Sequence, residues 1–198
     1  MYSFRIEQAI RAASVLHRDQ SRKGSLPLPF ITHLMATALI LHDYTDDEDV
    51  IVAALLHDTL EDTDYTEAEL KEDFGGRVAA LVISLTEPTS SGEQKLSWLE
   101  RKLAYVKQLK HAEEAALMIA AADKTHNFRT IVEEYCTDYN RFLQDFGKNL
   151  PERLEAYQSI ANVINVRLKN DIVHEFNHVF DEYKQFLINV ETSLEKSF

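Results

Sequence analysis

Four ionisable side chains are crowded into the segment HDTLED, residues 57–62, directly after the apolar run VIVAALL. His57 and Asp58 are adjacent, and Glu61 lies four residues after His57, so on a helix these side chains surround one small volume. Asp62 lies four residues after Asp58 and joins them. The C-terminal end of a helix carries partial negative charge, so three carboxylates there are unfavourable without a cation. The segment therefore predicts a metal site.

Two polar residues from distant parts of the chain are candidates to complete the coordination shell. His33 opens a segment of helical pattern, and Asp123 interrupts the apolar run LMIAAADK, where a buried carboxylate needs a partner. Asn127 lies four residues after Asp123, on the same helix face. Two imidazole nitrogens and two carboxylate oxygens suit a borderline ion such as Mn²⁺, Fe²⁺ or Zn²⁺. The competing interpretation, unrelated polar residues at helix ends, is disfavoured by four such residues in this order.

A second segment, HEFNH at residues 174–178, matches the HExxH pattern of zinc proteases. A catalytic zinc needs a third protein ligand and an open coordination position. Glu182 lies on the same face, but one rigid helix cannot wrap three ligands around an ion. We therefore interpret His174 and His178 as half-exposed residues beside an apolar stripe, and HDTLED as the site.

Composition excludes several classes of function. The 198 residues include 21 Lys plus Arg and 33 Asp plus Glu, a formal net charge of −12, which argues against non-specific binding of nucleic acid. The single cysteine, Cys136, permits no intramolecular disulfide and is interpreted as a small core residue. The N-terminus does not resemble a signal peptide, and no apolar run approaches the ~20 residues of a membrane span. We expect a soluble cytoplasmic protein without membrane contacts, and the sequence assigns no oligomeric state.

Apolar residues recur mainly at helical spacing, and the chain contains only 5 Gly and 4 Pro, so we predict an all-α fold. Asp46 or Asp47 is the expected N-cap of the third helix, and Thr66 with Glu69 forms a capping-box signature. Loops are expected at 21–30 and 87–94, with breaks at TDYN (137–140) and at 147–151. The helices are expected at 4–18, 32–43, 47–60, 66–75, 77–86, 97–110, 112–135, 151–168 and 171–195.

The order of His33, HDTLED and AADKTHNFR (121–129) resembles the HD-domain metal-dependent phosphohydrolases. The resemblance is stronger to the hydrolase domain of the RelA/SpoT alarmone enzymes, with the free-standing small alarmone hydrolases as the nearest type. It covers about residues 4–165 and is carried by SRKGSLPLPFITHL, AALLHDTLEDTDYT, FGGRVAALVISLTE and AADKTHNFR. The resemblance implies an HD-domain helical bundle at 1–168 and a C-terminal helix at 169–198, packed on the same domain.

The resemblance also implies a role for each matching residue. The ligands of one divalent ion, Mn²⁺ before Fe²⁺ or Zn²⁺, would be His33, His57, Asp58 and Asp123. Water and proton transfer would fall to Glu61 and Asp62. The nucleotide would be held by Arg22, Lys23 and Asn127, with Thr130 as a weaker assignment. The chain departs from the family's usual RKDG and His-Pro, with RKGS at 22–25 and Leu34 after the first ligand.

The implied function is hydrolysis of guanosine 3′,5′-bis(diphosphate)-type alarmones, with release of the 3′ pyrophosphate. Because such a substrate is anionic and the protein is acidic, local positive charge is needed, which the ion, Arg22 and Lys23 would supply. The basic residues of 97–110 are expected mainly as a solvated face: Arg101, Lys102, Lys107 and Lys110. The alternatives are an HD phosphohydrolase for another nucleotide and a nucleotide-binding module without activity, which the intact Glu61 and Asp62 disfavour.

Overall fold

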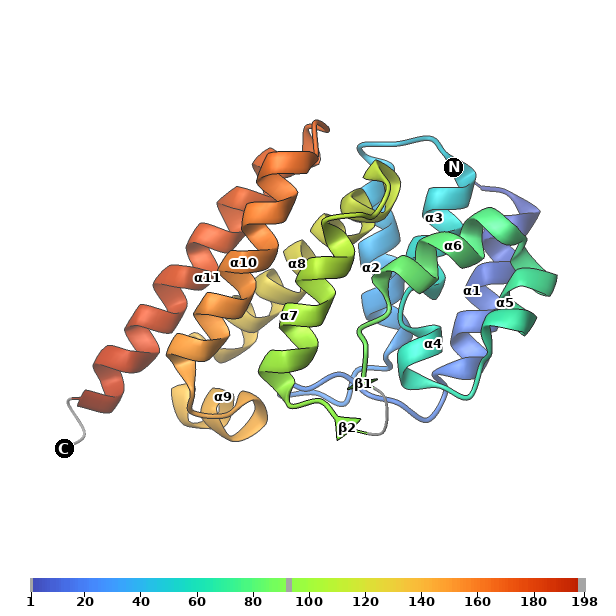
Figure 1. Ribbon diagram of the computed structural model, residues 1–198. Coiled ribbons are helices and arrows are strands. Elements are labelled where there is room, and N and C mark those ends of the chain that lie inside the picture. The colour runs from blue at the N-terminus through green and yellow to red at the C-terminus, as the bar shows by residue number, and fades with distance from the viewer. Residues whose placement is uncertain (1, 92–93, 196–198) are drawn as a thin grey trace.

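The computed structural model describes residues 2–91 and 94–195, and the predicted all-α class is confirmed (Figure 1). The helices of the first half are α1 (Phe4–Leu16), α2 (Ile31–His42), α3 (Glu48–Leu56), α4 (Thr59–Asp62), α5 (Glu67–Phe74) and α6 (Gly76–Leu85). Those of the second half are α7 (Trp98–Leu109), α8 (Glu114–Tyr135), α9 (Tyr139–Phe146), α10 (Leu150–Arg167) and α11 (Ile172–Glu195).

Local sequence signals act most directly at the starts of helices. Thr66 accepts a hydrogen bond from the Glu69 backbone N–H, and the Glu69 side chain accepts one from the Thr66 N–H, which completes the predicted capping box. Ser97 and Glu100 form a second capping box at the start of α7. Asp47, one of the two expected candidates, caps α3. These side chains satisfy backbone donors that have no partner inside the helix.

The prediction of one continuous helix over 47–60 is wrong, because the chain ends α3 at Leu56 and starts the short α4 at Thr59. Side chains form hydrogen bonds with the last carbonyl groups of α3. His57 Nδ1 lies 2.8 Å from the Ala54 carbonyl oxygen, and Thr59 Oγ1 donates to the Leu56 carbonyl at 2.6 Å. The residues of HDTLED are therefore divided between the C-terminal end of α3 and the short helix α4.

Two further details differ from the prediction. The region 137–146 is not a simple break, since Asp138 caps α9 by accepting from the Arg141 N–H. The loop expected at 87–94 contains a short antiparallel pair, β1 (Ser90–Ser91) with β2 (Gln94–Lys95). Residues 92 and 93 of that loop lie outside the described residues. A pair of two residues in each strand does not change the fold class.

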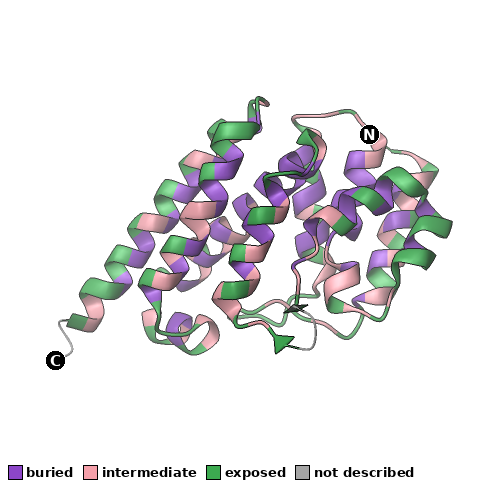
Figure 2. Ribbon diagram, viewed as in Figure 1, coloured by how far each residue is buried: buried purple, intermediate pink, exposed green. Residues whose placement is uncertain are grey.

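The core lies between the central helices, where Figure 2 shows an almost continuous buried stretch. All residues from Val50 to Leu56 of α3 are buried, as the apolar run predicts. Helix α11 lies along α8, and α2 packs on both α3 and α8. In Figure 1 α10 and α11 stand at one end of the molecule and α1 with α5 at the other. The division of the chain at residue 168 stays a prediction.

None of the helices described is both long and apolar enough to cross a membrane.

Candidate metal centre and substrate cavity

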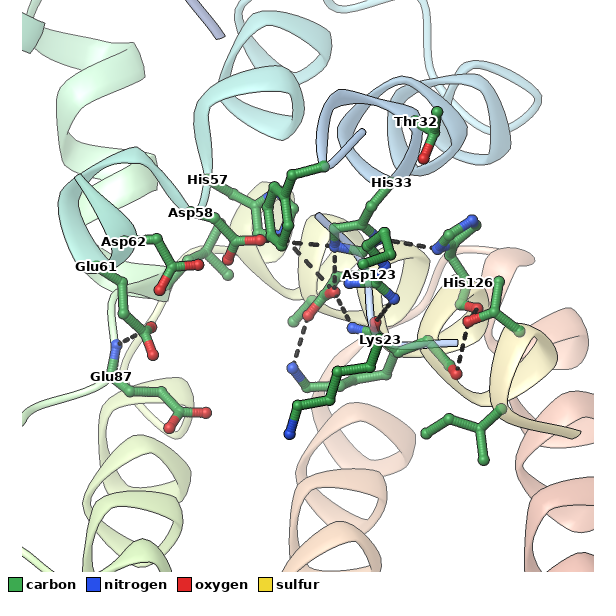
Figure 3. A pocket seen from close by; sticks show the side chains of 18 of the residues that line it. Lys23, Thr32, His33, His57, Asp58, Glu61, Asp62, Glu87, Asp123 and His126 are labelled. Carbon is green, nitrogen blue, oxygen red and sulfur yellow. Dashed lines mark hydrogen bonds and ion pairs between the residues drawn. The ribbon is translucent and has the colours of Figure 1, made fainter. Parts of the chain in front are cut away.

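In the centre of Figure 3, four side chains from different parts of the helical bundle point toward one another. His33 comes from the first turn of α2, and Asp123 lies in the middle of α8. His57 is the C-cap residue of α3, and Asp58 is the N-cap residue of α4. Both histidines and Asp123 are buried, with 1%, 5% and 6% of their surface exposed. The packing of α2 on α3 and α8 therefore brings together residues that are up to ninety positions apart.

Each imidazole faces both carboxylates. His33 Nε2 lies 3.2 Å from Asp123 Oδ1 and 3.6 Å from Asp58 Oδ2. His57 Nε2 lies 3.2 Å from Asp58 Oδ2 and 3.6 Å from Asp123 Oδ1. Donor atoms of His33, His57 and Asp58 all lie within 4.8 Å of one another, and the described residues contain no other such group of His, Cys, Asp or Glu. The arrangement can surround one small cation.

His57 provides the test of whether a metal fits. Because its Nδ1 lies 2.8 Å from the Ala54 carbonyl oxygen, Nδ1 carries the proton, and the buried Nε2 has no hydrogen-bond partner. A nitrogen lone pair that faces two carboxylates requires a cation. Burial alone would lower the pKa of His57, but Asp58 and Asp123 raise it to about 9, so a proton takes the cation's place when no metal is bound. The donor set fits a divalent ion.

The second histidine is oriented by His126, a residue of the AADKTHNFR segment that was not among the predicted site residues. His33 Nδ1 lies 2.8 Å from His126 Nδ1, and such a contact holds a single proton. If His33 keeps Nε2 free for a metal, its Nδ1–H donates to His126, as the outer ring nitrogen of a metal-bound histidine usually does. Burial lowers the pKa of His126 to about 3, which suits a neutral acceptor.

Asp123 is held by the residues around it. Lys124 Nζ lies 2.6 Å from its Oδ2, and Asn127 Nδ2 donates to its Oδ1 at 2.5 Å. Burial raises the pKa of Asp123, but Lys124 and the two histidines outweigh that effect and hold it well below its usual range. Asp123 is therefore a carboxylate, the form that coordinates a metal.

All ten residues singled out from the sequence line one cavity of about 560 Å³. The structure thus brings the predicted site together, while the role assigned to each residue stays a prediction. Glu61 and Asp62 lie on one side of the four donor residues in Figure 3, and His126 lies on the other. Arg22, Lys23, Asn127 and Thr130 line the same cavity.

Glu61 sits in an environment that favours its protonated form. Burial raises its pKa to about 7, with a further contribution from the neighbouring Glu87 and Asp58. Its Oε2 accepts the Glu87 backbone N–H at 3.2 Å. Glu87 is itself buried and forms an ion pair with Lys102. A carboxyl group with a pKa near neutrality can exchange protons at physiological pH.

The loop between α1 and α2 holds the two predicted nucleotide-binding cations. Arg22 Nη2 donates to Asn127 Oδ1 at 2.7 Å, and its guanidinium carbon lies 5.6 Å from the centre of the Phe30 ring. Lys23 Nζ donates to the Asp145 carbonyl at 2.6 Å. Asn127 thus links Arg22 to Asp123, one of the four donor residues, and connects the loop to the candidate metal centre.

The HEFNH segment has a different environment. His174 and His178 are exposed, and neither belongs to the donor group described above. Glu175 accepts hydrogen bonds from Tyr44 Oη at 2.7 Å and Arg129 Nη2 at 2.8 Å. Both interactions attach α11 to other elements, and the two histidines, predicted to be half-exposed, are exposed, so the scaffold role of this segment stays a prediction.

Several cavity residues carry no signal in the sequence alone. Lys102 was expected on a solvated face, but it is buried and paired, because α7 turns this side chain inward. Glu87, Lys124, His126 and Glu134 line the cavity as well. Glu87, Lys124 and His126 fall within segments that carry the family resemblance, and Glu134 lies outside them, but the place of each in the cavity follows from the packing of the fold.

An all-α bundle with two histidines and two aspartates around one point defines a metal-dependent HD-type protein. The model of the HD domain family matches residues 9–180, and the chain belongs to this family. Membership implies a divalent metal ion at the centre described above.

Relatives of known name support the same family. The human guanosine-3′,5′-bis(diphosphate) 3′-pyrophosphohydrolase MESH1 is 38% identical over 126 residues, which are 63% of this chain and 68% of that protein. The enzyme of that activity from Haemophilus influenzae is 33% identical over 163 residues, or 79% of this chain. The chain spans only about a fifth of the length of such bacterial relatives.

A solved structure of a metazoan orthologue of SpoT that hydrolyses ppGpp has the same fold, with a TM-score of 0.75 and 24% identity. The match covers 92% of this chain and 97% of that one.

Proposed function

We propose that this chain hydrolyses guanosine 3′,5′-bis(diphosphate)-type alarmones and releases the 3′ pyrophosphate. One observation carries the proposal: two imidazole and two carboxylate donors converge beside Glu61 in the wall of a 560 Å³ cavity. The names of the human and Haemophilus influenzae relatives support this choice of substrate. Together these observations favour an enzyme over a binding module.

The proposed reaction consumes one water molecule. The water oxygen bonds to the phosphorus that carries the 3′ oxygen, and the bond between that phosphorus and the 3′ oxygen breaks. The water loses a proton and the 3′ oxygen receives one, so the products are guanosine 5′-diphosphate and pyrophosphate. The chain must therefore position a base, an acid and an anionic leaving group.

The ion that we assign is Mn²⁺, with Fe²⁺ or Zn²⁺ as alternatives, held by His33, His57, Asp58 and Asp123. A donor set of two nitrogens and two carboxylate oxygens suits such borderline ions. When bound, the ion would lower the pKa of a water ligand and offset charge that develops on phosphorus.

Proton transfer is assigned to Glu61 and Asp62. A base is most effective when its pKa lies near the working pH, and the pKa of about 7 at Glu61 meets that condition. Burial also raises the pKa of Asp62, which lines the same cavity. We assign the removal of the water proton to Glu61 and the return of a proton to the 3′ oxygen to Asp62.

We assign the nucleotide to the part of the cavity that lies opposite Glu61 and Asp62. Arg22 can grip phosphate with two N–H groups or stack on a base, and Lys23 supplies a point charge. Asn127 and Thr130 follow Asp123 along α8 and lie beside this loop. A substrate with its scissile phosphate at the metal centre would therefore extend along α8.

An assay of the purified protein with Mn²⁺ tests the proposal. The substrates are guanosine 3′,5′-bis(diphosphate) and a panel of nucleoside mono- and triphosphates, and anion-exchange chromatography separates the products. We expect guanosine 5′-diphosphate and pyrophosphate from the alarmone, and none after treatment with a chelator. Cleavage of a panel member in place of the alarmone would favour an HD phosphohydrolase for another nucleotide. Binding without cleavage of any compound would favour the non-catalytic module.

A further inference from the structure

Glu134 lies at the end of a line of polar residues that leads away from the metal centre. Asp123, Asn127, Thr130 and Glu134 follow one another at spacings of four, three and four residues, so they occupy one face of α8. All of them line the cavity. A rise of 1.5 Å per residue places the first and last Cα atoms about 16 Å apart. A nucleotide with one phosphate at the metal centre would extend along this face toward Glu134.

The Glu134 carboxylate is fixed by the loop that carries Arg22. Its Oε2 accepts the Ser25 backbone N–H at 3.1 Å, across more than a hundred residues of sequence. Gly24 has a φ of +149°, which side-chain-bearing residues rarely adopt, and a Cβ at this position would require the Glu134 carboxylate to move, so the glycine suits this close approach. The RKGS sequence, which departs from the usual RKDG, is therefore matched to Glu134.

The other carboxylate oxygen of Glu134, Oε1, makes no hydrogen bond or ion pair within residues 2–91 and 94–195. A carboxylate only accepts hydrogen bonds, and it repels the phosphates of an incoming nucleotide. Its presence in a cavity for an anionic ligand is explained if the ligand brings N–H donors to this end. A guanine base has two neighbouring donors, N1–H and the exocyclic N2 amino group. Adenine has an acceptor at N1 and no amino group at C2.

We propose that Glu134 reads the base of the nucleotide and selects guanine over adenine, an inference that rests on the proposed hydrolysis of an alarmone. Arg22, which faces the Phe30 ring from 5.6 Å, lies in the same part of the cavity and offers a planar surface for the base. The carboxylate then has two functions. One oxygen holds the loop at Ser25, and both oxygens together accept the two guanine donors.

The test compares guanosine, inosine and adenosine 3′,5′-bis(diphosphates) as substrates. Inosine keeps N1–H but lacks the amino group, so kcat/KM should fall in the order guanosine, inosine, adenosine. Glu134→Gln replaces an acceptor oxygen by a donor but can still accept the Ser25 N–H. We expect it to reduce the preference for guanosine over adenosine about 10- to 100-fold, the usual effect of losing a charge-assisted hydrogen bond.

The matched control is Glu133→Gln. This variant removes the same charge from the neighbouring residue, which is exposed and does not line the cavity. It should keep the full preference for guanosine. An unchanged preference in Glu134→Gln would overturn the inference and leave Glu134 as an anchor of the loop only. Equal effects in both variants would indicate a general effect of charge and would also overturn it.

A binding measurement separates this inference from the proposed function. Calorimetry would compare guanosine and adenosine 5′-diphosphates, which need no cleavage, on the wild-type protein and on Glu134→Gln. If the wild type cleaves none of the three alarmones but prefers the guanosine diphosphate through Glu134, the proposed hydrolysis fails and the inference stands. If the alarmone is cleaved and Glu134→Gln keeps its preference for guanine, the inference alone fails. No preference in the wild type overturns the inference as well.

Discussion

HDTLED and HEFNH each contain a histidine and a glutamate close together on the chain, but they differ in what surrounds them. His57 is buried between carboxylates from two other helices, whereas the His178 side chain is 74% exposed on the outside of α11. Glu61 faces a cavity, and Glu175 is already bound by Tyr44 and Arg129. A short motif becomes a metal site only where the fold supplies ligands from other elements and excludes water.

The largest expected effect concerns bound metal. His57→Ala or Asp123→Ala removes a donor that faces the other three, so the variant should lose its metal and its turnover. Elemental analysis of the purified proteins measures the metal content. His174→Ala is the matched control from the exposed motif and should keep the wild-type content. Normal metal in the first two variants would disprove the assignment of the centre.

The next largest expected effect is a loss of turnover without a loss of metal. Glu61→Gln keeps the shape of the side chain but cannot take a proton, so kcat should fall about 10²–10⁴-fold, the usual contribution of a general base. Metal content should stay at the wild-type level. Glu175→Gln, the corresponding change in HEFNH, should change kcat by no more than a few-fold. Near wild-type turnover in Glu61→Gln would assign the base to another residue.

A smaller effect is expected for the loop that carries Arg22 and Lys23. Replacing both by Ala should raise KM for the alarmone about 10- to 100-fold, since two charge-assisted contacts are lost. Metal content should not change, because neither cation is a ligand. Activity toward a simple phosphate ester, which makes no base contact, should also be kept.

The control for this pair is Lys107→Ala with Lys110→Ala, which removes the same charge from two exposed positions, one in α7 and one at its C-cap. It should leave KM unchanged. An equal loss on the ester and the alarmone would show that Arg22 and Lys23 serve phosphate in general. No loss on the alarmone would contradict the guanosine assignment.

The comparison of the two motifs also shows how far the sequence alone could lead. Helix starts at Thr66 and Ser97 were predicted because a capping box acts over four residues. The break at His57 was missed, since helical periodicity continues through it, and the side-chain contacts of His57 and Thr59 with the last carbonyl groups of α3 are visible only in the structure. The four predicted metal ligands, His33, His57, Asp58 and Asp123, could be proposed because they are polar residues within or beside apolar helical segments.

Other members of the site could not be found in this way. His126 matters because its Nδ1 meets His33, and Glu134 matters because Ser25 and Gly24 approach it. Both contacts join segments about a hundred residues apart. A composition or a periodicity carries no information about them, so they appear only when the packing of α2 on α8 is known.

The smallest expected effect is on stability, and its sign should differ between the two glutamates. In the folded protein the pKa of Glu61 is raised from an ordinary 4.5 to about 7, mainly by burial and then by Glu87 and Asp58. A carboxyl group with a raised pKa costs folding free energy when it is ionised. The cost is absent well below pH 4.5, grows between pH 4.5 and pH 7, and is complete above that range.

Glu61→Gln should therefore increase the free energy of unfolding at pH 8 by about 1–3 kcal/mol, measured by urea unfolding of chelator-treated protein. At pH 4.5 the gain should shrink to a few tenths of a kcal/mol. Glu175→Gln should instead lower the free energy of unfolding at pH 8 by about 1 kcal/mol, because Tyr44 or Arg129 loses an acceptor. If Glu61→Gln is destabilising at pH 8, Glu61 is not a strained carboxylate in a cavity, and the difference drawn between the two motifs would not hold.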